Sequence, residues 1–71
     1  MNKKVLKVSK SYEEKMKKLY EDYQLNVSKM LEEYTDEKEY IKHYVKATEI
    51  YIKKCKELKD EFIIDSINAM V

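Results

Sequence analysis

The sequence predicts a mainly α-helical fold with one short N-terminal strand, assembled as an intertwined homodimer. Glycine and proline are both absent from the 71 residues, which disfavours the tight turns on which sandwiches and barrels depend. Apolar residues recur at helical spacing along most of the chain. The chain is also too short to bury a large core alone, so a second copy is expected to complete the fold.

The first segment alternates as a strand does. In the run Lys4–Val8, Leu6 and Val8 fall on one face, while Val5 and Lys7 fall on the other. A frayed terminus is the alternative interpretation. This alternation is the observation that predicts a strand.

Two helices are expected to follow this strand. Ser11 and Glu14 form a capping box, which predicts a first helix over residues 12–23. Gln24–Asn26 then interrupts the pattern, and Asn26 is a suitable N-cap for a second helix. The rival prediction is one unbroken helix over 12–34, because a continuous apolar stripe crosses the interruption. Its members are Tyr12, Met16, Leu19, Tyr23, Val27, Met30 and Tyr34.

The second half predicts one further helix with a regular packing seam. Thr35–Glu37 supplies a capping side chain and acidic residues for its first turn. The seam alternates by three and four residues, as in a coiled coil, through Ile41, Tyr44, Thr48, Tyr51, Cys55, Leu58 and Phe62. Beyond it the apolar face rotates to Ile63, Ile64, Ile67, Met70 and Val71, which predicts a bend or a second partner surface.

Charge and composition narrow the function classes. The net charge of +1 divides into +4 over residues 1–30 and −3 over residues 31–71, so the first half is the one suited to phosphate. The absence of glycine removes glycine-rich nucleotide motifs. A single cysteine, Cys55, predicts a reducing, cytoplasmic location without a disulfide. No membrane span, secretory leader, catalytic constellation, metal site or cofactor is expected.

The first half resembles the ribbon-helix-helix family of MetJ/Arc-type DNA-binding proteins. The matching text is Val5–Met16 followed by Leu25–Glu33, with Leu25–Ser28 in the place of the family's turn between helices. Two departures are Gln24, where the family usually has glycine, and Lys4, where it has an apolar residue. The resemblance implies that residues 1–36 form a DNA-binding unit and that residues 37–71 are a C-terminal helical extension.

The resemblance also assigns roles to residues. The ribbon would point Lys3, Val5 and Lys7 into the major groove of DNA. The predicted second helix start would hold a DNA phosphate at Asn26, Val27 and Ser28. The expected dimer core comprises Leu6, Val8, Met16, Leu19, Met30 and Leu31. The expected packing residues of the C-terminal helix are Ile41, Tyr44, Tyr51, Leu58 and Phe62.

The function expected on this basis is sequence-specific binding of double-stranded DNA by a homodimer, as a transcriptional repressor or an antitoxin-type regulator. In this scheme the C-terminal helix extends the dimer, joins dimers along DNA or captures a protein partner. The alternative from another class is a helical hairpin or coiled-coil adaptor without DNA binding. In that adaptor, residues 12–34 would pack directly on residues 37–62.

Overall fold

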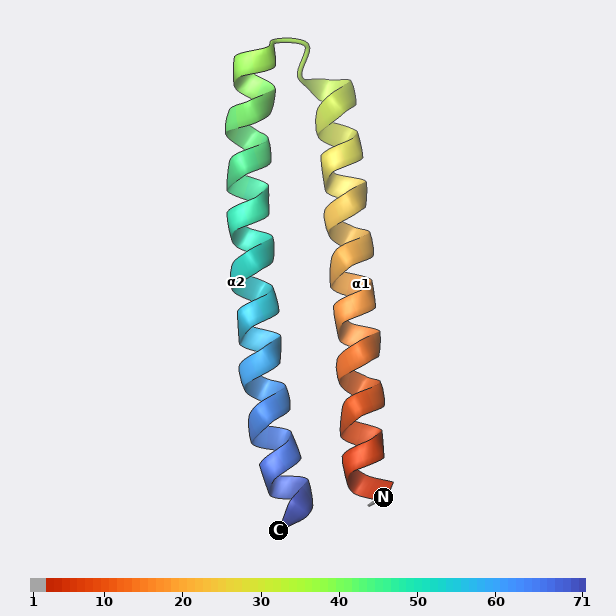
Figure 1. Cartoon of the computed structure of the whole chain (residues 1–71). Helices are drawn as coiled ribbons and strands as arrows, with labels where there is room; N and C mark the ends of the chain where they lie inside the picture. Colours follow the sequence, from red (N-terminus) through yellow and green to blue (C-terminus); the bar gives the residue numbers. More distant parts are fainter. Residues whose placement is uncertain (1–2) are drawn as a thin grey trace.

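Two long antiparallel helices make up the described chain (Figure 1). The structure is a computed structural model, and it describes residues 3–71. α1 spans Lys3–Glu33 and α2 spans Glu37–Met70. The two ends of the chain lie together at one end of the hairpin, which we call the open end; the connection between the helices forms the loop end (Figure 1).

A three-residue connection, residues 34–36, joins the helices. The Tyr34 N–H donates to the Met30 carbonyl at 2.9 Å, which satisfies one of the last free carbonyls of α1. Asp36 has extended backbone angles (φ −83°, ψ 123°), and its Oδ1 accepts from the Lys38 N–H at 3.1 Å. The helix start predicted at Thr35–Glu37 is therefore confirmed.

The predicted N-terminal strand is wrong, because the segment from Lys3 to Val8 forms the first turns of α1. No residue of the described range 3–71 is in a strand. A lone strand leaves its backbone N–H and C=O groups without partners, whereas a helix satisfies them within the segment. The ribbon-helix-helix resemblance and the intertwined, ribbon-paired dimer are therefore wrong as well. Residues 1 and 2 of the predicted DNA-binding unit lie outside the described residues.

The predicted break at Gln24–Asn26 is also wrong, and the rival prediction of one continuous helix is confirmed. Ser11 and Asn26, which resemble N-caps in the sequence, lie inside α1. Their helix propensities differ from those of good helix formers by only a fraction of a kcal/mol. Packing of the apolar stripe along α2 outweighs this local preference.

The residues that face the other helix repeat with a period close to 3.67. On α1, and at Tyr34 directly after it, they are half-buried and follow steps of three, four and four residues: Val5, Val8, Tyr12, Met16, Leu19, Tyr23, Val27, Met30 and Tyr34. On α2 the corresponding positions are Tyr40, His43, Ala47, Tyr51, Cys55, Leu58, Phe62, Ser66 and Ala69. This period is close to that of a straight α-helix, so two straight helices stay in contact over their whole length.

The hairpin encloses almost no core. Ala47, at 9% exposure, is the only described residue that is buried. The Cα atoms extend over 53 × 15 × 11 Å with a radius of gyration of 16.4 Å, against about 11 Å for a compact domain of this length. The accessible surface is 6142 Å², whereas roughly 4,700 Å² is typical of a compact monomer of 8.7 kDa. Most apolar side chains are thus covered on one side only.

Candidate interaction surface

Stacked rings hold the two helices in register. Three pairs have centroid separations of 4.5, 4.5 and 4.3 Å, namely Tyr12 with Phe62, Tyr23 with Tyr51, and Tyr34 with His43. Each such pair contributes about 0.5–1.5 kcal/mol beyond the area it buries. Because the pairs occur near the open end, the middle and the loop end, a shift of one helix along the other would break all three.

A short chain of hydrogen bonds adds a polar contact to this interface. The Thr48 hydroxyl donates to the Tyr44 carbonyl at 2.9 Å, and its Oγ1 lies 2.6 Å from the Tyr23 hydroxyl. A threonine hydroxyl has one hydrogen, so Tyr23 must be the donor to Thr48. The hydrogen bond with Tyr23 raises the pKa of Tyr44 above its ordinary value of 10.0. The Tyr44 hydroxyl therefore stays neutral near physiological pH and acts through hydrogen bonds.

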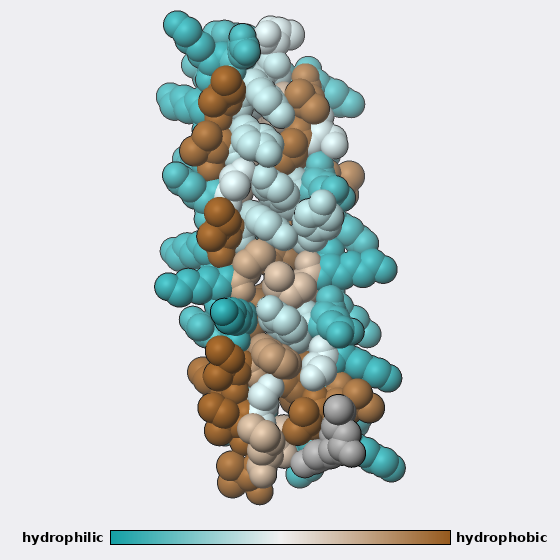
Figure 2. All heavy atoms as spheres, viewed as in Figure 1, coloured by the Kyte–Doolittle hydropathy of each residue, from teal (hydrophilic) through white to brown (hydrophobic). Residues whose placement is uncertain are grey.

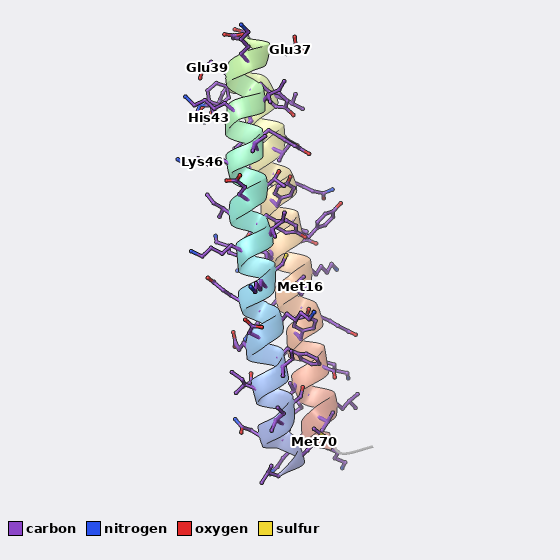
Figure 3. All side chains as sticks on the ribbon, turned by 60° about the vertical axis from the view of Figure 1, so that its left-hand side comes forward. Met16, Glu37, Glu39, His43, Lys46 and Met70 are labelled. Atoms are coloured by element: carbon purple, nitrogen blue, oxygen red, sulfur yellow. The ribbon has the colours of Figure 1, made fainter. Side chains whose placement is uncertain are left out.

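Charged contacts among residues 3–71 are few and exposed, and one of them joins the two helices. Lys15 Nζ lies 3.0 Å from Glu61 Oε1, and both side chains are about half exposed. His43, which stacks on Tyr34, has its Nε2 3.7 Å from Glu39 Oε2 at the loop end of α2 (Figure 3). Exposed ion pairs of this kind contribute about 0–1 kcal/mol. Ring stacking and apolar contact, rather than charge, therefore determine how α1 packs on α2.

One polar group in the interface has no partner. The Ser66 hydroxyl is buried between the helices near the open end and makes no hydrogen bond. Ser66→Ala removes this unpaired group and raises helix propensity, so we expect the free energy of unfolding to increase by about 1 kcal/mol. Thermal unfolding followed by circular dichroism measures the change. A variant that unfolds at a lower temperature than the parent would show that the hydroxyl has a partner in solution.

One side of the hairpin carries most of the exposed large apolar residues. Most of them directly follow a residue that faces the other helix. In a right-handed helix, the residue after an interface residue is rotated around the helix axis in a fixed direction. Because the two helices are antiparallel, this rotation points to the same side of the hairpin in both, so these residues share one face. On α1 they are Leu6, Tyr20 and Leu31, and on α2 they are Ile41, Ile52, Ile63, Ile67 and Met70. Figure 2 looks onto a face with brown side chains along α2 and at both ends of α1.

A single line of residues on α2 forms the centre of this face. We call it the α2 stripe; its members are three or four residues apart and are Ile41, Val45, Glu49, Ile52, Lys56, Lys59, Ile63 and Ile67. The five apolar members are between 45% and 60% exposed. Four of the apolar members occupy the outer parts of the stripe, and Ile52 lies among the three charged members near its middle.

The opposite side of the hairpin is more polar. A groove of about 290 Å³ runs beside Ala47 there, because the small side chain leaves space between the helices. Asp22, Asn26 and Lys54 line it together with Ile50. This side lacks a continuous apolar line, so the side with the α2 stripe is the candidate interaction surface.

The structure separates the residues predicted to contact DNA. Lys3 and Lys7 are exposed on the first turns of α1, and Val5 is half-buried against α2. Asn26, Val27 and Ser28 lie within α1, whose N–H groups at that point are inside the helix rather than at its start. The exposed backbone amides expected for phosphate binding are therefore not found at these three residues.

The predicted dimer-core residues divide between two surfaces. Val8, Met16, Leu19 and Met30 are half-buried in the hairpin interface of the same chain, whereas Leu6 and Leu31 are exposed at 44% and 62%. Of the residues predicted to pack along the C-terminal helix, three face α1 and two are exposed. Those facing α1 are Tyr51, Leu58 and Phe62; those exposed are Ile41 and Tyr44.

Sequence reasoning missed three interface residues in the loop-end half of α2 and the continuous stripe beside them. Tyr40, His43 and Ala47 face α1 there. Of the predicted heptad seam in this half, Tyr44 and Thr48 also contact α1, through Tyr23, whereas Ile41 is exposed. The spacing of the apolar residues on α1 is the sequence signal that could have identified these interface residues. Its steps of three, four and four residues predict the same period in any helix that packs along its whole length.

The comparisons with known proteins identify no family. No family model matches the chain, and neither the curated proteins nor the solved structures contain a match. Neither described helix is long and apolar enough to cross a membrane. Within residues 3–71, no group of three or more histidine, cysteine, aspartate or glutamate side chains is placed to hold a metal ion.

Proposed function

We propose that this chain is a helical-hairpin interaction module that binds an amphipathic helix of a protein partner through the α2 stripe. The observation that carries the proposal is an exposed line of five branched apolar side chains on a hairpin with one buried residue. Exposed apolar side chains gathered on one face in this way are typical of interaction sites on soluble proteins. A partner helix with apolar residues at the same spacing would cover it by side-to-side packing.

This proposal corresponds to the sequence-based alternative, the helical adaptor. The DNA-binding prediction required two paired strands that enter the major groove, and Lys3 to Val8 are helical. The repressor and antitoxin roles depended on that ribbon, so they lose their structural basis. Binding of double-stranded DNA stays a prediction.

Photo-crosslinking in cells that naturally contain the chain tests the proposal. Ile52→benzoylphenylalanine places a photoreactive group in the α2 stripe, and Glu57→benzoylphenylalanine places it about 140° around the same helix, because each residue turns by about 100°. We expect protein adducts from position 52 and few from position 57. Equal adduct yields from both positions, or none from position 52, would refute the α2 stripe as the binding site.

A further inference from the structure

We infer that the partner of the α2 stripe is a second copy of this chain, with the two α2 helices packed antiparallel about a two-fold axis at the level of Lys54. The inference rests on the proposed function and names its partner. The product is a four-helix bundle made of two hairpins, with the apolar sides of both turned inward. Both the spacing and the charges of the α2 stripe support this arrangement.

The spacing of the stripe is palindromic. Its steps are four, four, three, four, three, four and four residues, so the line reads the same in both directions. In an antiparallel pair centred on Lys54, residues equally far from Lys54 face each other. The facing pairs are Ile41 with Ile67, Val45 with Ile63, Glu49 with Lys59 and Ile52 with Lys56, each occurring twice.

The chemistry of these pairs is complementary. The outer two pairs join branched apolar side chains, and Glu49 meets Lys59 with opposite charge. The aliphatic stem of Lys56 can lie over Ile52 while its ammonium group reaches water. Neither Glu49 nor Lys59 forms an ion pair within residues 3–71, so both are available to a second chain. Parallel α2 helices would instead place Glu49 on Glu49 and Lys59 on Lys59, which is repulsive.

The exposed area matches what a dimer needs. The chain exposes roughly 1,400 Å² more than a compact monomer of its mass, and a standard protein interface buries about 800 Å² per partner. The apolar residues that α1 adds to the same side, Leu6 and Leu31, lie near opposite ends of the hairpin. In the antiparallel pair, Leu6 of one copy therefore approaches the end of the other copy that carries Leu31.

Charge reversal with complementation tests the arrangement. Sedimentation equilibrium compares the parent, Glu49→Lys, Lys59→Glu, and an equimolar mixture of the two variants. We expect the parent to be a dimer at tens of micromolar, and each variant to dimerise about tenfold more weakly because both charged contacts become repulsive. In the heterodimer of the two variants, the lysine introduced at position 49 faces the glutamate introduced at position 59. The other contact keeps Lys59 opposite Glu49, so dimerisation returns to the parent level.

Each other outcome overturns the inference in a distinguishable way. A parent that is monomeric at 1 mM, while position 52 still crosslinks to another protein, refutes the second copy and leaves the proposed function standing. If neither Glu49→Lys nor Lys59→Glu changes the strength of dimerisation, the dimer uses another surface. A mixture no more dimeric than the separate variants refutes the antiparallel α2 pairing, and points to packing of α2 on α1 of the other copy. Circular dichroism verifies that each variant stays helical.

Discussion

Ala47→Asp is expected to unfold the hairpin. Ala47 faces α1 near the middle of the interface and is 9% exposed, so an aspartate there would place a carboxylate between the helices, beside apolar groups and Asp22. The carboxylate would lose part of its hydration and be repelled by Asp22. We expect the free energy of unfolding to fall by about 3 kcal/mol or more, which is a large part of the stability of so small a domain. Loss of the helical far-ultraviolet circular dichroism signal at 25 °C measures this unfolding.

The matched control is Lys46→Asp. Lys46 precedes Ala47 on α2 and points away from α1 (Figure 3). The substitution introduces aspartate, the same weak helix former, without placing a charge in the interface. We therefore expect the free energy of unfolding to fall by about 0.5 kcal/mol. If both variants lost helix to the same extent, helix propensity rather than burial at position 47 would explain the effect.

Ile63→Asp is expected to abolish association while leaving the hairpin folded. Ile63 is 45% exposed within the single chain, so its replacement removes little of the packing between α1 and α2. In the proposed dimer the residue occurs twice and faces Val45 of the other copy. Two buried apolar contacts replaced by carboxylates should weaken dimerisation by at least about a hundredfold. Size-exclusion chromatography with light scattering measures the change.

Ile64→Asp is the control for this prediction. Ile64 is also an exposed isoleucine, at 58%, but one residue turns it about 100° around the helix, off the α2 stripe. Dimerisation of this variant should stay within a few fold of the parent. Equal losses at positions 63 and 64 would mean that general surface hydrophobicity, and not the α2 stripe, holds two chains together.

The sequence-based predictions hold where a local capping signal agrees with the pattern of apolar residues along the chain. α2 starts within the predicted segment Thr35–Glu37, where Asp36 is the cap. An extended residue that accepts from an N–H two residues on needs no tertiary contact. At Ser11 and Asn26 the same kind of local signal is misleading. Both residues are compatible with a cap, but the apolar stripe that continues past them packs on α2, and this packing decides for a continuous helix.

The sequence alone determined the helical character of residues 12–34, the start of α2 and the part of its interface formed by Tyr51, Cys55, Leu58 and Phe62. These four positions fit a repeat of 3.5 residues and one of 3.67 almost equally well over such a short distance. The tertiary structure decided that Lys3–Val8 is helical and that Ala47, rather than Thr48, is the buried residue. The physical reason is that both outcomes depend on the opposite helix, which completes the packing of α1 and determines which side of α2 is covered.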